Sequence, residues 1–315
     1  MTAYFASLSF LKLLKSMPGG IAQGLIWGLM ALGLYITFRL LDVAYLTVDG
    51  SFTTGGAVTV MLILAGWPAW AALLVAVLAG ILAGLCTGLL HTRLGIPAIL
   101  AGILTQLSLY SINLRIMGMT ANKAVSVDKY QLLLSSRNIP ASILTGLLIA
   151  LVLISAFYWY FGTEQGSAIR ATGANPAMCR ALGISVDSMK VLGLAFSNGI
   201  VALSGGLMSQ YQGFADINMG RGAIVIGLAA VIIGEVIGHA LLGKYLNFFG
   251  TLSFVVVGGV LYYLVIVIVL WLKLNSNDLK LFTAVIVALF LAVPYLREHS
   301  KSSFVRLKKG GAGNA

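Results

Sequence analysis

The sequence predicts an all-α fold, a polytopic bundle of membrane-spanning helices, and two observations support that prediction. Of the 315 residues, 59% are hydrophobic and 9% are charged, and the mean hydropathy is +0.99; soluble domains have far more polar compositions. Apolar runs of about 20 residues recur along the chain, as bilayer-crossing helices require. They are continuous rather than alternating, so helices are favoured over a barrel.

Nine membrane segments are expected, some of them short or broken. They are residues 18–41, 51–66, 68–91, 96–118, 140–161, 191–211, 222–239, 245–272 and 281–296. The second and seventh are short and interrupted by glycine, and each follows a polar turn. Paired short segments of this kind point to an internal repeat around a transport path. Gly80, Gly84 and Gly88 recur at four-residue spacing, which predicts a close helix contact.

The two ends of the chain are expected to lie outside the transmembrane domain, residues 18–296. Residues 1–17 contain lysines that follow apolar residues and no cleavage site, so an amphipathic interfacial helix is expected rather than a signal peptide. Residues 297–315 form a basic cytoplasmic tail. The net charge of +11 does not indicate nucleic-acid binding, because the basic residues flank apolar runs, where orientation and anionic lipids explain them.

Residues 163–190 form a polar island between two membrane segments. Asn175 can cap a helix start, Pro176 fits a first helical turn, and Gly183 suits a left-handed C-terminal position. We therefore predict a short helix over about 176–182, outside the membrane. The positive-inside rule places the island in the cytosol, with eleven of the 20 lysines and arginines on that side and the N-terminus outside.

Polar residues inside apolar segments are costly in lipid and are candidates for a translocation path. Candidate path residues are Asp49, Ser51, Gln106, Asn113, Ser197, Asn198 and Glu235. Gln106 and Asn113 are seven apart and share a helix face. The alternative, that such side chains only join helices by hydrogen bonds, stays open. Asp49 is expected to be a cap or turn residue beside the path, and Glu235 a hydrogen-bond anchor.

The island resembles the cytoplasmic loop of bacterial ABC-importer permeases of the branched-chain amino acid and ribose type. The matching residues follow the pattern G-x-x-I-x-A-x-G-x-N-x-A-x-x-R-x-x-G-I-x-V, namely Gly166, Ile169, Ala171, Gly173, Asn175, Ala177, Arg180, Gly183, Ile184 and Val186. The likeness extends to residues 23–34, 46–56 and 227–234 and covers most of 20–295. The wording of the acidic turn is similar to a subgroup paired with aromatic amino-acid-type binding proteins.

The resemblance implies a homodimeric permease in the inner membrane that translocates a small solute, such as an amino acid, delivered by a solute-binding protein. Two separate ATPase subunits would bind ATP and magnesium, and this chain would hold no cofactor and would not be an enzyme. The residues that would couple to the ATPase are Gly166, Arg170, Gly173, Asn175, Pro176, Arg180 and Gly183. The hypothesis for residues 119–139 and 212–221 is that they form the docking surface for the binding protein; the alternative is that the loop is only a solvated connector. The alternative is an ion-gradient-driven secondary transporter or channel.

Overall fold

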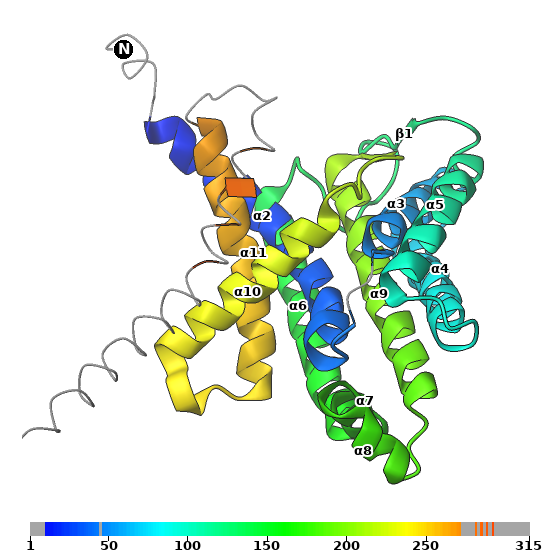
Figure 1. Cartoon of the computed structure of the whole chain (residues 1–315). Helices are drawn as coiled ribbons and strands as arrows, with labels where there is room; N and C mark the ends of the chain where they lie inside the picture. The colour runs from blue at the N-terminus through cyan, green and yellow to red at the C-terminus, as the bar shows by residue number, and fades with distance from the viewer. Residues whose placement is uncertain are drawn as a thin grey trace, which may run out of the picture.

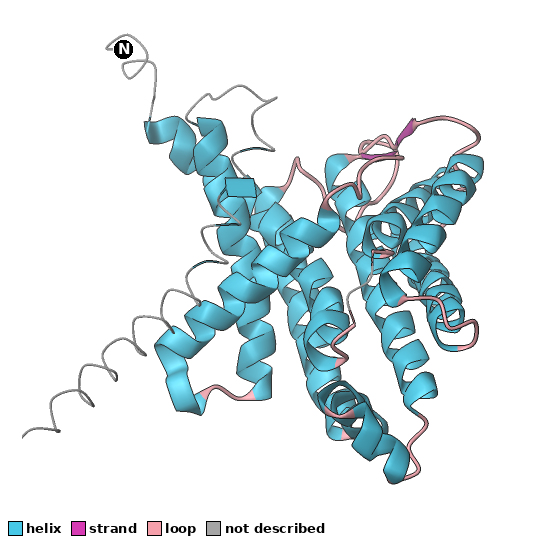
Figure 2. Cartoon of the chain, viewed as in Figure 1, coloured by secondary structure: helices cyan, strands magenta, loops and turns pink. Residues whose placement is uncertain are grey.

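The computed structural model describes residues 10–43 and 46–271, together with single positions at 281, 284, 285, 288 and 292. Helices make up most of this part of the chain (Figures 1 and 2). In chain order the elements are α2 (Phe10–Tyr35), the π-helical turn η1 (Ile36–Leu40), α3 (Val48–Leu64), α4 (Ala69–Thr92), α5 (Ala98–Ile116), β1 (Asn122–Ala124), α6 (Ile139–Gly162), α7 (Glu164–Ala174), α8 (Pro176–Ala181), α9 (Val186–Gln212), β2 (Phe214–Asp216), α10 (Ala223–Leu242), the 3-10 turn η2 (Gly243–Tyr245) and α11 (Phe248–Trp271).

Seven of the described helices are long and apolar enough to cross a membrane, which confirms the predicted polytopic bundle. The apolar helix α3 matches the predicted second segment but has only 17 residues. Helix α10, predicted to be short or broken, is a continuous helix of 20 residues. The predicted ninth segment, 281–296, and the tail 297–315 fall outside the described residues, apart from the single positions given above.

Two predicted boundaries differ from the observed ones. Helix α2 already begins at Phe10 and continues through Pro18, so no break in the helix marks the predicted boundary between residues 17 and 18. Residues 1–9 are outside the described part, and an interfacial position for this end stays a prediction. Helix α9 begins at Val186, five residues before the predicted segment, and Asp187 in its first turn favours a helix start beyond the apolar run. The polar island therefore ends near residue 185.

The long helix α9 lies at the centre of the bundle and contacts α4 through the predicted glycine stripe. A Cβ built on Gly84 would lie 2.7 Å from Cα of Ala195, and one built on Gly88 would lie 2.9 Å from Cα of Val191. These positions admit only glycine because the two backbones touch, as small residues permit at helix interfaces in membranes. The predicted close helix contact is confirmed.

The two ends of the molecule carry different structures (Figure 1). At one end β1 and β2 form an antiparallel pair in which Lys123 faces Ala215. This pairing joins the two predicted docking segments, 119–139 and 212–221. At the opposite end lie α7 and α8. We call these the strand end and the α8 end.

Candidate functional site

Helix α8 has the local structure that the sequence predicts. The Oδ1 atom of Asn175 accepts a hydrogen bond from the backbone N–H of Met178 at 3.0 Å, which caps the helix start. Pro176 occupies the first turn, and Gly183 adopts a left-handed conformation with φ of +78° just after the helix. The predicted start, cap and terminating glycine are confirmed, and the helix ends at Ala181, one residue early.

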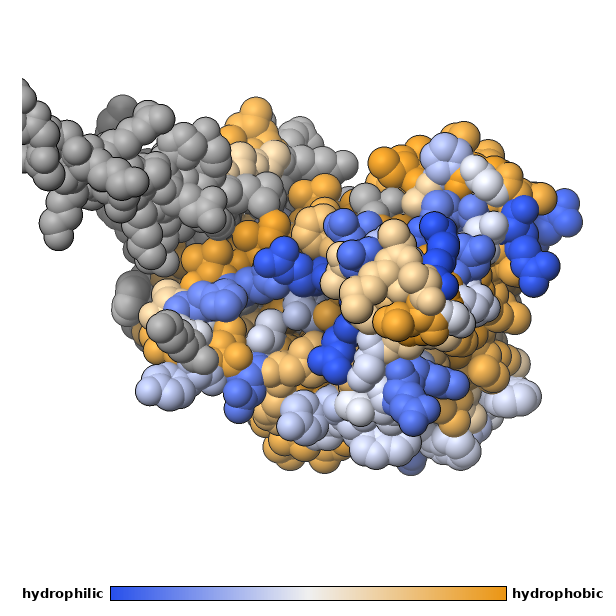
Figure 3. All heavy atoms as spheres, turned by 60° about the horizontal axis from the view of Figure 1, so that its bottom comes forward, coloured by the Kyte–Doolittle hydropathy of each residue, from blue (hydrophilic) through white to orange (hydrophobic). Residues whose placement is uncertain are grey.

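The outward surface of α8 combines apolar and basic side chains. Met178 is 60% exposed, Leu182, just after the helix, is 66% exposed, and Arg180 is also exposed. Cys179 points inward and is buried. Figure 3, which brings the α8 end forward, shows polar and apolar atoms interleaved on this face. Met178 and Leu182 thus place apolar side chains beside Arg180 on the outer side of α8. The sequence analysis named Arg180 but missed Met178 and Leu182.

Helix α7 connects α8 to the bundle and was not predicted as a separate helix. Its start has two features that are recognisable in the sequence, a capping residue, Thr163, and an acidic residue in the first turn, Glu164. The Oγ1 atom of Thr163 accepts a hydrogen bond from the N–H of Gly166 at 3.4 Å. Gly166 packs against the end of α6, where a Cβ would lie 2.4 Å from Cα of Phe161. Gly166 therefore has a packing role that no larger residue could fill.

Two contacts fix α7 to neighbouring membrane helices. The guanidinium of Arg170 lies over the ring of Phe248, 5.7 Å from its centroid, at the start of α11. A Cβ built on Gly173 would overlap the carbonyl oxygen of Leu40 and lie 2.9 Å from Cα of Leu41. Helix α7 thus touches the backbone of residues 40–41, at the end of the turn η1, directly. These residues lead along the chain to α3.

The starts of α3 and α10 meet inside the bundle. Asp49, in the first turn of α3, accepts hydrogen bonds from the backbone N–H groups of Gly222 at 3.0 Å and Ile224 at 3.1 Å. The hydroxyl of Thr53 accepts from the N–H of Gly220 at 3.2 Å. Asp49 therefore caps another helix, α10, as a carboxylate stabilises a helix N-terminus. The expectation that Asp49 is a cap residue is confirmed, and the two polar turns predicted from the sequence lie together.

This junction begins at about the middle depth of the bundle. The Oγ atom of Ser51 donates to Oδ1 of Asn198 at 2.6 Å, and Asn198 lies near the middle of α9. Helix α3 therefore starts in the interior and runs towards the strand end, where its last turns pack with Met117 and Ala215. A helix that begins at mid-depth exposes unpaired backbone groups there, which in a bilayer must line a cavity or be buried in protein.

A polar pocket of about 270 Å³ opens beside the junction. Its walls come from α3, α5 and the segment before α10: Asp49, Gly50, Thr53, Gln106, Leu107, Tyr110, Asn113, Ile217 and Arg221. Three of the predicted path residues, Asp49, Gln106 and Asn113, meet here. The sequence analysis missed Arg221, although it stands in the polar turn that precedes α10.

The other predicted path residues lie elsewhere and join helices. Ser197 donates to the carbonyl of Gly33 at 2.7 Å, and Ser51 and Asn198 pair with each other; all three of these polar side chains are buried. Glu235 forms an ion pair with Arg39 at 2.8 Å between α10 and η1, as expected for an anchor. For these four residues the observed geometry is the alternative left open by the sequence, namely interhelical bonding.

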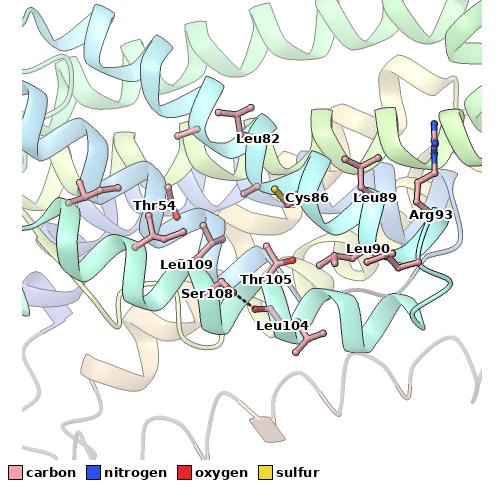
Figure 4. A pocket seen from close by; sticks show the side chains of 15 residues that line it. Thr54, Leu82, Cys86, Leu89, Leu90, Arg93, Leu104, Thr105, Ser108 and Leu109 are labelled. Carbon is pink, nitrogen blue, oxygen red and sulfur yellow. Dashed lines mark hydrogen bonds between the residues drawn. The ribbon is translucent and has the colours of Figure 1, made fainter.

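A larger cavity of about 880 Å³ lies between α4 and α5 (Figure 4). Leucines and Cys86 dominate its walls, and the hydroxyl of Ser108 donates to the carbonyl of Leu104 in its own helix at 2.9 Å. The hydroxyl of Thr105 likewise bonds Ala101. The hydroxyl of Thr105 also accepts from that of Thr87 in α4 at 3.0 Å, and the hydroxyl of Thr54 bonds Gly50 within α3. The hydroxyls of this cavity are thus already bonded to protein groups, and the smaller pocket at Asp49 is the better candidate for a polar solute.

The described residues form a bundle with seven candidate membrane helices, a polar pocket at mid-depth and a capped helix at one end, an architecture typical of membrane transport proteins. The comparisons with known proteins specify the class. The sequence profile of the family described as "branched-chain amino acid transport system / permease component" matches residues 16–294, and the chain belongs to this family. It is a multi-pass permease of the ABC-importer class in the inner membrane.

Individual relatives agree with this assignment. The chain is 38% identical over 288 residues to a tyrosine transport system permease protein of Clostridioides difficile, covering 91% of this chain and 94% of the relative. It is 33% identical over 244 residues to an autoinducer 2 import system permease protein of Yersinia pseudotuberculosis, covering 76% of this chain and 65% of the relative. No solved structure matches the chain.

Proposed function

We propose that two copies of this chain form the membrane path of an importer for a small solute of the amino-acid type. Two separate ATPase subunits bind ATP and magnesium and contact α8 in the cytosol, while a solute-binding protein docks at the strand end. Membership of the permease family and the names of its relatives support import and a small solute. The observation that supports coupling through α8 is the backbone contact of Gly173 with Leu40.

The coupling route follows covalent and packing contacts from α8 to the pocket. Met178, Leu182 and Arg180 offer the ATPase an apolar and basic surface. Asn175 is the single residue between α7 and α8 in the chain, so a movement of α8 also moves α7. Helix α7 then displaces η1 through the contact of Gly173 with Leu40. Because η1 leads into the start of α3, the displacement reaches Asp49 and the junction with α10.

The docking surface for the binding protein is built from the two loop segments at the strand end. Beyond the β1–β2 pair, the N–H of Leu133 donates to Oε1 of Gln210 at 3.0 Å, and the N–H of Ser136 donates to the carbonyl of Tyr211 at 3.1 Å. These bonds hold the long loop 119–139 against the end of α9. A surface fixed in this way needs little ordering when a partner binds, which favours docking.

Helices α5 and α6 are both largely exposed in the single chain, and their compositions indicate which of them faces lipid. Helix α6 is strongly apolar, and most of its residues are not buried by the rest of the chain, as expected for a lipid-facing helix. Helix α5 is covered just as little although it is less apolar, and it presents Gln106 and Tyr110 at the polar pocket. Polar side chains are costly against lipid. We therefore assign the α5 face to the second copy and the path between the copies, and α6 to the lipid.

Purification tests this function. A tagged chain expressed with the genes that neighbour its own should co-purify with a separate ATPase and, in liposomes, take up solute only with ATP. Met178→Glu should weaken ATPase binding, whereas Met119→Glu, at another exposed methionine at the strand end, should leave it intact. Full-rate uptake by the chain alone without ATP would instead establish an ion-driven transporter.

A further inference from the structure

The polar pocket beside Asp49 contains a buried acceptor that lacks a donor. Asn113 is 1% exposed, and its Oδ1 atom has no hydrogen-bond partner, while its Nδ2 atom lies 3.5 Å from the carbonyl of Gly50. A buried polar atom without a partner is costly, and such atoms in native proteins require an explanation. A ligand that brings a donor into the pocket would satisfy it.

The same side of the pocket carries a negative charge. Each carboxylate oxygen of Asp49 accepts one backbone N–H, from Gly222 and from Ile224. A carboxylate has about four acceptor positions, so both oxygens can accept further bonds. Asp49 and Asn113 thus form a wall of acceptors, which suits an ammonium group with its three donors.

A positive charge, opposite to that of Asp49, comes from Arg221 in the segment before α10. Arg221 lines the pocket, is exposed, and forms no ion pair with any of the residues that the structure describes. Its planar guanidinium can bind a carboxylate through two parallel hydrogen bonds. Gln106, half-buried on α5, adds a side chain that both donates and accepts.

We propose that this pocket is a transit site for an amino-acid zwitterion. The ammonium group binds at Asp49 and Asn113, and the carboxylate binds Arg221. Leu107 and Tyr110, both exposed at the rim, contact the side chain of the solute. The volume of about 270 Å³ equals that of about nine water molecules at ~30 Å³ each, which fits the charged end of a small solute. This inference rests on the proposed function, since it places the solute in the membrane subunit itself.

Protection of a cysteine at the rim tests the site without relying on transport. Leu107→Cys is introduced with Cys86→Ala, because Cys86 is exposed and Cys179 is buried. The complex with its ATPase, in nanodiscs, is labelled with N-ethylmaleimide in the presence of L-tyrosine, tyramine or 3-(4-hydroxyphenyl)propionate. These three probes share one ring and differ only in carrying both charges, the positive charge or the negative charge.

L-Tyrosine should protect the introduced cysteine at concentrations about tenfold or more below those needed for either singly charged probe, because each contributes one charge-assisted contact fewer. Arg221→Gln should reduce protection by L-tyrosine to the level of tyramine and leave tyramine unchanged. Asn113→Leu should weaken both. Arg115→Gln, an exposed arginine of α5 that does not line the pocket, is the matched control and should change nothing.

Equal protection by the three probes, absence of protection by all of them, or unaltered protection in Arg221→Gln would overturn the site. The same preparation is assayed for ATP-dependent uptake of L-tyrosine after reconstitution with the binding protein. A complex that hydrolyses ATP and transports, yet shows no preference for the zwitterion at the introduced cysteine, disproves the site and retains the proposed function. A chain that purifies without any ATPase disproves the proposed function instead.

Discussion

Replacing Gly173 by alanine disturbs the contact between α7 and η1 without changing a charge. The added methyl group would overlap the carbonyl oxygen of Leu40 and lie 2.8 Å from its carbon and 2.9 Å from Cα of Leu41. These are backbone atoms, so no side chain can turn away, and α7 or η1 must shift. Overpacking costs about 1–3 kcal/mol, which outweighs the gain of at most about 1 kcal/mol that alanine has over glycine in a helix.

A net cost of about 1.4 kcal/mol lowers the equilibrium constant for packing α7 against η1 tenfold. We expect Gly173→Ala to lower solute uptake per ATP hydrolysed by about that factor in proteoliposomes that contain ATPase and binding protein. Gly162→Ala is the control, since a Cβ at the end of α6 meets nothing within 4 Å. Equal coupling ratios in the two variants would refute the route through η1.

Three further predictions concern stability and coupling. Asp49→Ala leaves two N–H groups at the start of α10 unpaired, so the purified complex should lose about 1–3 kcal/mol of stability, and a melting temperature equal to that of the unmodified complex would contradict this. Gly55→Ala places a methyl group 2.7 Å from a Cα atom of α9 and should lower the melting temperature, whereas Gly146→Ala, with 3.6 Å of room, should not. Asn175→Ala removes the cap of α8, at about 1 kcal/mol, and should reduce solute-stimulated ATP hydrolysis; an unchanged rate would show that the cap is dispensable.

The sequence predicted the parts of the molecule whose causes are local. The cap at Asn175 and the left-handed glycine at 183 depend on neighbours within one turn, and both were predicted correctly. The membrane helices follow from long apolar runs, and their predicted bounds are off by a few residues at most except at Phe10 and Val186. Helix α7 was missed even though Thr163 and Glu164 form a recognisable helix start.

The contacts that build the site depend on residues far apart in the chain. Asp49 caps a helix that begins more than 170 residues later, and Gly173 touches Leu40 across more than 130 residues. No local pattern reports such distances. The same limit explains why Ser51 and Asn198 were grouped with Gln106 and Asn113 as path residues. Polarity alone marks a side chain as costly in lipid, and only the fold distinguishes a helix-joining hydrogen bond from a pocket wall.

The central claim is that α8 faces the ATPase in the cytosol, and the sidedness of this helix tests it most directly. Cys179 is buried and unsuited to labelling, so Met178→Cys, at a 60% exposed position, is used with Cys86→Ala. In cells that express the chain without its ATPase, a membrane-impermeant maleimide should label this cysteine only after the cells are opened, and should label Met119→Cys, at the strand end, in intact cells. Labelling of Met178→Cys in intact cells would place α8 outside, where no ATPase could reach it.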